Sequence, residues 1–221
     1  ISKPTPTIRH SFFSLYCAFS FALAVLYPAI KKLPFPINNK SDTIKNIINK
    51  MIYAFVVQAR LGSTRLPGKI LKPFYGNQSI LDLMVHKLSA ISNIPVIIAT
   101  TNSVINEPIE KKALALGVKC FRGEENDVLK RFIDVAEYFD IQGIFRICSD
   151  NPFLDVHAAR QLVEIAMKSC NDYISFDIDG TPSIKTHFGF WGEFVTLDAL
   201  KRVIGFTDDL LYREHVTNYI Y

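Results

Sequence analysis

From Met51 onward, the sequence alternates between short apolar runs and longer segments in which apolar residues recur at helical spacing. The runs at 52–58 and 95–100 have the length of buried strands, and 80–91 lies between them with the spacing of a helix. This β-α-β order predicts a parallel connection, which has to cross over a face of the sheet. The chain is therefore expected to adopt an α/β fold, in which a mostly parallel sheet is covered by helices on both faces.

The remaining expected elements continue this order. Strands are predicted at 118–121, 143–147, 173–176 and 188–195, and helices at 107–116, 127–139, 156–168, 197–203 and 213–219. Gly117 can end the first of these helices, and Asn126 or Asp127 can cap the second. The sequence shows no internal repeat or low-complexity tract in 51–221, so we expect this part of the chain to form one domain.

The first fifty residues do not fit this pattern. Residues 11–30 carry no charge, and their length is about that of a membrane span or signal segment. Pro28 interrupts that run, and no methionine precedes Met51, where the strand pattern begins. We interpret residues 1–50 as an extension outside the catalytic core. It is either sequence upstream of a natural start at Met51 or a membrane anchor.

Charge and cysteine content exclude two classes of protein. A net charge of +4 over 221 residues is too small for a dense basic face, so a nucleic-acid partner is not expected. The four cysteines form no CxxC pair, which favours reduced thiols in the core of a cytoplasmic protein over a disulfide framework. These cysteines are Cys17, Cys120, Cys148 and Cys170.

The stretch that follows the first strand is the most informative. Residues 58–71 read QARLGSTRLPGKIL, with three cations, two glycines and no acid. In open α/β sheets, ligands bind beyond the carboxyl ends of the strands, which is where this loop lies. Arg60, Arg65 and Lys69 would suit a polyanion such as a triphosphate, and Gly62 and Gly68 let the backbone approach it.

Two common phosphate-binding loops are excluded by spacing. A Walker loop has four residues between its glycines and Ser or Thr after its lysine, whereas here five intervene and Ile70 follows Lys69. The dinucleotide-binding GxGxxG pattern is absent as well. A solvated basic loop without a ligand is the alternative interpretation.

The loop QARLGSTRLPGK resembles the signature of the sugar-activating nucleotidyltransferases. It is most similar to the cytidylyltransferase-like group, which includes spore coat polysaccharide biosynthesis protein F and, more distantly, the enzymes that make CMP-linked acidic sugars. The resemblance covers essentially all of 51–221. It continues at 99–102 (ATTN), 121–123 (FRG), 127–129 (DVL), 146–152 (RICSDNP) and 212–217 (YREHVT).

The resemblance implies a Rossmann-like three-layer α/β sandwich of the nucleotide-diphospho-sugar transferase type. It also implies a cytoplasmic enzyme that uses Mg²⁺ and converts CTP and a sugar, with an acidic sugar favoured, into a CMP-sugar and pyrophosphate for surface polysaccharide synthesis. Relatives commonly pair, so a homodimer is expected. A membrane partner is expected only if residues 11–30 are an anchor.

The resemblance also assigns roles to individual residues. Arg60 and Lys69 would carry the charge of the departing pyrophosphate with help from Arg65, and Asp150 would hold the metal. Arg213, Glu214 and His215 would lie on the sugar side. The nucleotide would be bound by Ala59, Gly62, Ser63, Gly68, Thr100, Thr101, Asn102 and Arg122.

Each role has a structural alternative. Asp150 precedes Asn151-Pro152, as acids in surface turns often do, and residues 100–102 are also ordinary turn formers. Arg122 could lock a loop instead of contacting the nucleotide. His215 could be structural, as a histidine beside charged residues usually is.

The sequence departs from the family pattern at two places. Trp191 stands where relatives place a second metal-binding carboxylate, so Glu193, Asp177 or Asp179 would have to supply it, or Asp150 would act alone. The chain stops at Tyr221, where relatives continue, which suggests a truncated C-terminus. The alternatives are therefore a glycosyltransferase of the same fold that uses a nucleotide sugar, or a catalytically inactive nucleotide-binding homologue.

Overall fold

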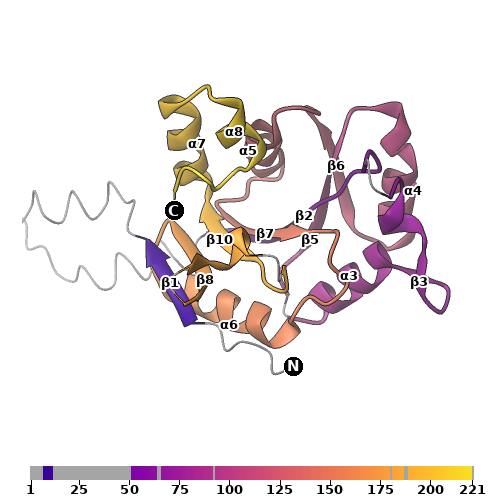
Figure 1. Ribbon diagram of the computed structural model, residues 1–221, viewed down its shortest axis with the longest axis horizontal. Coiled ribbons are helices and arrows are strands. Elements are labelled where there is room, and N and C mark those ends of the chain that lie inside the picture. The colour runs from indigo at the N-terminus through magenta and orange to yellow at the C-terminus, as the bar shows by residue number, and fades with distance from the viewer. Residues whose placement is uncertain are drawn as a thin grey trace, which may run out of the picture.

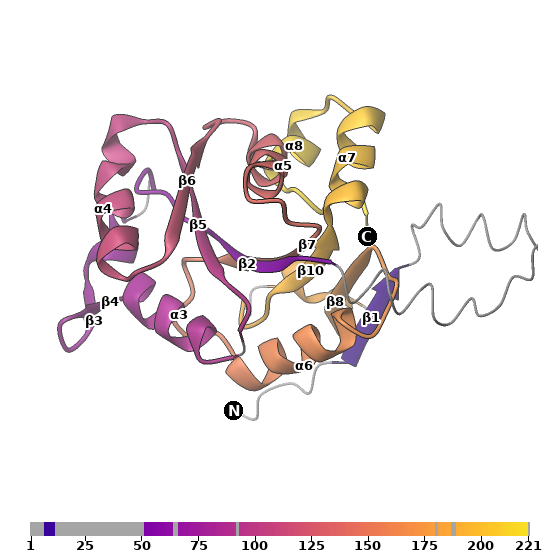
Figure 2. The same cartoon turned by 180° about the vertical axis from the view of Figure 1, so that it is seen from behind.

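The computed structural model describes the backbone of residues 7–11, and residues 51–63, 66–91, 93–179, 181–186 and 189–220. Within these residues, a central twisted sheet separates two layers of helices (Figure 1). Figure 2 shows α3 and α6 on one side of the sheet and α5, α7 and α8 on the other. The predicted three-layer α/β sandwich is therefore confirmed.

The described strands of the sheet follow the order β1-β8-β10-β7-β2-β5-β6, and β9 pairs with β8. The neighbours β7, β2, β5 and β6 run parallel, whereas β10 is antiparallel to both β7 and β8. The sheet is thus mostly parallel in direction, as predicted. Its strands are β1 (Thr7–Ser11), β2 (Tyr53–Gln58), β5 (Val96–Thr101), β6 (Lys119–Gly123), β7 (Gly143–Cys148), β8 (Tyr173–Ile178), β9 (Thr181–Pro182) and β10 (Glu193–Thr196).

The helices α3 to α7 lie at the predicted places, and α8 is a short additional helix. They are α3 (Ile80–Ser89), α4 (Glu107–Ala115), α5 (Val128–Tyr138), α6 (Val156–Ala166), α7 (Leu197–Phe206) and α8 (Leu210–Glu214). Short additions are the 3₁₀ turns η1 (Lys69–Leu71), η2 (Val104–Asn106) and η3 (Ser183–Lys185), and the hairpin strands β3 (Pro73–Tyr75) and β4 (Gln78–Ser79). Asp127 caps α5 by accepting a hydrogen bond from the amide of Lys130, so the second of the two predicted caps is the one used.

The core lies on both faces of the sheet because side chains alternate along each strand. On one face, Tyr53, Phe55 and Val57 of β2 pack with apolar residues of α3, α4 and α6. On the other face, Ala54 and Val56 pack with residues of α5 and α7. Strand β2 is therefore buried on both sides, which explains its uninterrupted apolar run.

Two predicted elements differ from the structure. The strand expected at 188–195 is limited to β10 (Glu193–Thr196), with irregular backbone at 189–192. The helix expected at 213–219 is wrong, because α8 ends at Glu214 and turns follow. Val216 has φ 42°, a left-handed conformation that a helix cannot contain, and its side chain is fully buried in the core. Val216 is therefore buried in a non-helical turn, although the spacing of apolar residues here resembles that of a helix.

A further strand lies at the edge of the sheet. The backbone of Thr7–Ser11 forms β1 and pairs antiparallel with β8, from Thr7 opposite Asp177 to Ser11 opposite Tyr173. The sequence predicts no strand here. We also predict that residues 1–6 and 12–50 lie outside the catalytic core. These residues are outside the described part of the chain. None of the described helices is long and apolar enough to cross a membrane.

The described cysteines form no disulfide, but they are less buried than predicted. Cys120 is half-buried, and Cys148 and Cys170 are exposed. The prediction of core thiols is therefore wrong for these last two, which occupy the end of a strand and a loop, where the chain meets solvent.

Asp82 in the first turn of α3 joins two helices. Its Oδ2 accepts hydrogen bonds from the amide and hydroxyl of Ser79 at 2.8 and 2.7 Å, and its Oδ1 lies 2.7 Å from Nζ of Lys112 on α4. Burial would raise the pKa of Asp82, but the hydrogen bonds from Lys112 and Ser79 outweigh it and hold the pKa below its ordinary value. The ionised carboxylate therefore stabilises the fold.

We expect Asp82→Asn to lower the free energy of unfolding at pH 7 by about 1–2 kcal/mol. A depressed pKa contributes stability above the unfolded value of about 4 and loses it as pH falls through the folded value. The gap between wild type and variant should therefore close as pH drops below about 4. Thermal melting between pH 7 and pH 3 measures this, with the exposed Asp198→Asn as control. An equal gap at both pH values would contradict the ionic role of Asp82.

Candidate functional site

The loop that follows β2 is anchored to β5 and to the 3₁₀ turn η2 that follows β5. The amide of Ala59 donates to the carbonyl of Ala99 on β5 at 3.0 Å, and the amide of Leu61 donates to Oδ1 of Asn106 at 2.8 Å. The loop then turns back, because the amide of Gly68 donates to the carbonyl of Leu61 at 3.1 Å. Gly68 has φ +69°, which a side chain would strain. This closed turn places Lys69 at the start of η1.

Lys69 and Asp150 face each other across the neighbouring strands β2 and β7. Nζ of Lys69 lies 3.4 Å from Oδ2 of Asp150, and their side chains are 27% and 57% exposed. The backbone holds the two segments together, since the amide of Ser149 donates to the carbonyl of Gln58 at 3.2 Å. The cationic loop and the acid after β7 therefore share one edge of the sheet, with both charged groups accessible to a ligand.

The other members of the predicted phosphate loop are placed as follows. Arg60 is exposed, directly after Ala59, which is buried. The amide of Ser63 donates to the carbonyl of Leu61 at 2.8 Å, and a Cβ on Gly62 would meet no atom within 4 Å. Arg65 lies outside the described residues. The loop therefore presents the guanidinium of Arg60 and the ammonium of Lys69 to solvent.

The end of β5 is buried, which changes its predicted role. Thr100 and Thr101 are fully buried, and Oγ1 of Thr101 accepts from Nδ2 of Asn106 at 2.6 Å and from the amide of Ser103 at 3.3 Å. The side chains of Thr100 and Thr101 are therefore enclosed, and a contact of this segment with the nucleotide stays a prediction. Asn102 is exposed, so its side chain is the part of this segment that a ligand can reach.

Asn106 was not predicted from the sequence. Its side chain is 1% exposed and bridges Leu61 of the cationic loop to Thr101 of β5. An asparagine before a helix reads as an ordinary cap, and only the fold shows that its amide joins two loops. Asn106 therefore positions the loop that carries Arg60 and Lys69.

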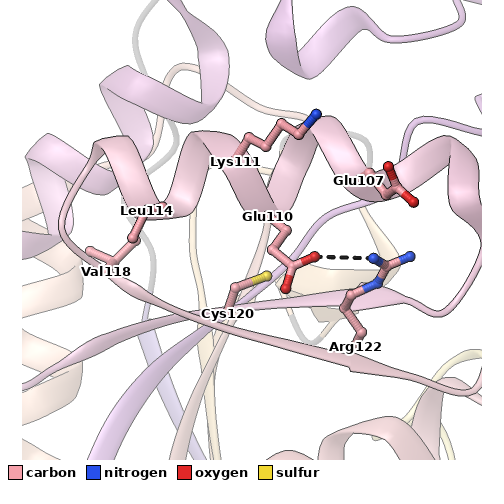
Figure 3. A pocket seen from close by; sticks show the side chains of 7 residues that line it. All are labelled: Glu107, Glu110, Lys111, Leu114, Val118, Cys120 and Arg122. Carbon is pink, nitrogen blue, oxygen red and sulfur yellow. Dashed lines mark hydrogen bonds and ion pairs between the residues drawn. The ribbon is translucent and has the colours of Figure 1, made fainter.

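Arg122 serves to lock a loop, the second of its two predicted roles. Its Nη2 donates to the carbonyls of Asn102 and Ser103, both at 3.1 Å. Its Nη1 lies 3.0 Å from Oε2 of Glu110 on α4 (Figure 3). The guanidinium is thus used to hold the segment after β5.

The pocket in Figure 3 lies between α4 and β6 and contains neither Lys69 nor Asp150. Cys120 is the thiol that lines it. Burial, with a smaller contribution from Glu110, raises the pKa of the Cys120 thiol to about 11. The thiol is therefore protonated at neutral pH and unsuited to nucleophilic chemistry.

The predicted sugar-side residues lie on and after α8. Nη1 of Arg213 is 3.1 Å from Oδ2 of Asp127, and its Nη2 is 2.6 Å from Oδ1 of Asp208. Arg213 therefore ties α8 to the first turn of α5. Glu214 and His215 are exposed. A role for these three residues at a sugar stays a prediction.

Glu193 is not available as a second metal ligand. It is 3% exposed, and its carboxylate accepts from Nη1 of Arg146, from Oγ1 of Thr217 at 2.8 Å and from the hydroxyl of Tyr173 at 2.7 Å. Of the three predicted candidates, Glu193 is therefore excluded by a buried ion pair. Trp191, at the expected carboxylate position, packs in the core near Phe176, with ring centroids 6.1 Å apart.

The remaining acids give no dense metal cluster. In the described part of the chain, no group of three or more His, Cys, Asp or Glu side chains could hold a metal ion. Asp177 and Asp179 end β8, which β10 separates from β7. Asp150 is the carboxylate that lies directly beside Lys69 at this edge.

Comparison with known proteins identifies the family. The cytidylyltransferase family matches residues 54–221. The spore coat polysaccharide biosynthesis protein SpsF of Bacillus subtilis is 33% identical over 174 residues, which are 75% of this chain and 68% of that protein. The uncharacterized protein MJ1063 of Methanocaldococcus jannaschii is 35% identical over 167 residues, which are 75% of this chain and 65% of that protein. The chain thus spans about two thirds of these relatives.

More distant relatives share a smaller part. The 3-deoxy-manno-octulosonate cytidylyltransferase of Blochmanniella pennsylvanica is 31% identical over 135 residues, 60% of this chain and 51% of that protein. The similarity therefore extends to an enzyme named for an acidic sugar, over about half of its length.

Solved structures agree with this assignment. A cytidylyltransferase from Leptospira borgpetersenii superposes with a TM-score of 0.67 at 30% identity, over 77% of this chain and 71% of that one. A CMP:2-keto-3-deoxy-manno-octonic acid synthetase complexed with CTP gives a TM-score of 0.53 at 13% identity, over 76% and 83%, which supports the fold alone. The predicted fold, family and enzyme class are confirmed: the chain belongs to the cytidylyltransferase family of nucleotidyltransferases.

Proposed function

We propose that this chain transfers CMP from CTP to a hydroxyl group of an acidic sugar and releases pyrophosphate, in the synthesis of a surface polysaccharide. The observation that carries the proposal is the 3.4 Å pairing of Lys69 with Asp150 at the carboxyl ends of β2 and β7. The names of the Bacillus and Blochmanniella relatives support the polysaccharide and the acidic sugar. A cytoplasmic location and a homodimer stay predictions.

The reaction needs charge neutralisation more than covalent help from the protein. A sugar oxygen forms a bond to the α-phosphorus of CTP, the bond from that phosphorus to the β-bridging oxygen breaks, and the hydroxyl proton passes to solvent. Negative charge accumulates on the departing pyrophosphate. Lys69 and Arg60, both reachable from solvent at this edge, would neutralise it.

The turn formed by Gly68 and Leu61 supports this role. It fixes the backbone on which Lys69 stands, and Ile70, the next residue, is 2% exposed and anchors η1 in the core. The backbone that carries the ammonium group of Lys69 is therefore fixed in position, which reduces the reorganisation that the transition state requires.

The acid after β7 fits the Mg²⁺ that the family resemblance implies. Mg²⁺ is commonly bound by one or two carboxylates together with substrate phosphates and water, and Asp150 is a single accessible carboxylate beside the cationic loop. Asp150 would hold the ion, which when bound screens the charge of the phosphate oxygens. Asp150 would in this way also orient the triphosphate toward Lys69.

Incubating the full chain with CTP, Mg²⁺ and 3-deoxy-manno-octulosonate, alongside other acidic and neutral sugars, tests the proposal. We expect pyrophosphate release with CTP and an acidic sugar, and none with ATP. Failure to bind CTP, or release of a nucleoside diphosphate from a nucleotide sugar, would overturn it. The second result would instead support the alternative of a glycosyltransferase of the same fold.

Asp150→Asn should lower turnover by about a hundredfold or more and weaken the response to Mg²⁺, because it removes the charge that holds the ion. The matched control is Asp140→Asn, since Asp140 precedes the other end of β7. Steady-state pyrophosphate release across a Mg²⁺ titration gives both quantities. A titration curve for Asp150→Asn that superposes on that of wild type would remove Asp150 from the site.

A further inference from the structure

Arg131 on α5 is a buried arginine with half of its hydrogen-bonding capacity unused. It is 1% exposed, and its Nη1 donates to the carbonyl of Glu124 at 2.5 Å and more weakly to that of Glu125 at 3.5 Å. Its Nε is buried without a hydrogen-bond partner, and its Nη2 makes no hydrogen bond with any described residue. Arg131 also forms no ion pair within the described part of the chain.

The unused side of this guanidinium is the one suited to anions. The N–H bonds of Nε and Nη2 point the same way, so together they can donate two parallel hydrogen bonds to two oxygens of one phosphate or carboxylate. Nη1 points away from this pair and donates its hydrogen bonds to carbonyl groups of the loop after β6. The side chain is therefore held at Nη1, while its Nε and Nη2 are enclosed without a hydrogen bond to any described residue.

Arg131 lies at the same edge of the sheet as the cationic loop. Its stem packs on the end of β6, since a Cβ on Gly123 would come within 3.0 Å of Cγ of Arg131. Gly123 pairs with Thr101 of β5, and the amide of Ala59, just before Arg60, donates to Ala99 of the same strand. In the order β2-β5-β6, the first turn of α5 and the loop that begins at Arg60 therefore lie at the same edge of the sheet, and Arg60 is close enough to lower the pKa of Arg131.

Three acids lie near Arg131, but none of them forms an ion pair with it. Burial lowers the pKa of Arg131, the positive charge of Arg60 lowers it further, and Glu125, Asp127 and Glu124 raise it. Asp127 is used by Arg213 and by the amide of Lys130, and no carboxylate is within ion-pair distance of Arg131 among the described residues. A buried cation without a partner is costly, so this arrangement favours a ligand that supplies the negative charge.

We propose that Arg131 is an anion-binding residue of the nucleotide site, whose Nε and Nη2 hold two oxygens of one phosphate of the nucleotide beside Arg60. The inference rests on the proposed function, because it takes CTP as the ligand. A phosphate is favoured over a sugar carboxylate because the neighbouring cation, Arg60, opens the loop that also delivers Lys69. Residues 124–126, which lie over Arg131, are exposed, and they have to shift when the phosphate binds.

Calorimetric titration of the full chain with CTP and with cytidine, in the presence of Mg²⁺, tests the inference. Arg131→Met should weaken CTP binding by about tenfold to a hundredfold and leave cytidine binding unchanged, because it removes a charge-assisted pair of hydrogen bonds. Arg131→Lys, which keeps the charge without the paired donors, should show a smaller loss. Arg160→Met is the matched control, since Arg160 donates to the carbonyl of Ala90 at the surface.

The melting temperature without ligand separates this role from a structural one. If Arg131 binds a ligand and does not stabilise the fold, the melting temperature of Arg131→Met without ligand should equal or exceed that of the wild type. If Arg131 is structural, the melting temperature should fall. If Arg131→Met does not fold, Arg131→Lys carries the binding test.

Three results would overturn the assignment of Arg131. They are unchanged CTP affinity in the variants, an equal loss for cytidine, which would assign Arg131 to the base, and a loss confined to the acidic sugar. Failure of the wild-type chain to bind CTP would instead refute the proposed function, so the two failures are distinguishable.

Discussion

We expect Lys69→Ala to lower the rate of pyrophosphate release by about a thousandfold and to weaken CTP binding, while the protein stays folded. The ammonium of Lys69 stands on η1 beside Asp150, where it would neutralise charge that develops on the leaving pyrophosphate. Loss of one such group from an active site commonly costs two to three orders of magnitude in rate. The fold should survive because the Lys69–Asp150 contact is at the surface, and surface pairs contribute about 1 kcal/mol or less.

Steady-state kinetics with CTP as the varied substrate, together with thermal melting, checks this result. Lys72→Ala is the matched control, because Lys72 is exposed and lies three residues further along the same turn. Unchanged kinetics in Lys69→Ala would refute the proposal that the cationic loop binds the triphosphate. A large fall in melting temperature would show that the lysine serves the fold instead.

Glu193→Gln should destabilise the protein by about 3–5 kcal/mol, because it removes the negative charge that pairs with the buried guanidinium of Arg146. Arg146 and Glu193 are 7% and 3% exposed, so water cannot replace the lost charge. The same carboxylate also accepts from Tyr173 and Thr217, and these bonds weaken when the acceptor becomes neutral. In a domain of this size the melting temperature should fall by roughly 10 °C.

Urea unfolding of the wild type, Glu193→Gln and the exposed control Glu164→Gln measures the difference. The double variant Arg146→Met/Glu193→Leu should recover part of the loss, since it leaves no uncompensated charge. A loss of less than about 1 kcal/mol in Glu193→Gln would mean that the ion pair contributes no more than a surface pair does.

The arrangement of elements was predictable because it depends on local patterns. The apolar runs and helical spacings give the strands, the helices and their alternation, and parallel strands end at one edge of a sheet. That is enough to expect Lys69 and Asp150 near each other, 81 residues apart in the chain. The hairpin at 73–79 and the strand at Thr7–Ser11 were not expected, because short pairings of this kind leave little periodicity in the sequence.

The side-chain partners at the site were not predictable, because they depend on contacts between distant segments. Thr101 and Arg122 look like ligand-binding residues in a strand-end motif, and the structure uses both to fix the segment at 101–103. Glu193 looks like a free carboxylate until β10 places it against Arg146. Arg131 reads as an ordinary residue of an amphipathic helix, and only its burial without an acid marks it out.

The antiparallel strand β10 has a consequence for how the chain chooses its strand pairing. Glu193 stands directly opposite Arg146 in the ladder between β10 and β7. A slip of one residue would turn Glu193 to the opposite face of the sheet and place Phe194 across from Arg146 instead. The slip would break the buried ion pair between Arg146 and Glu193, which costs about 3–5 kcal/mol. The ion pair thus favours the observed register of β10 against β7 over a register shifted by one residue.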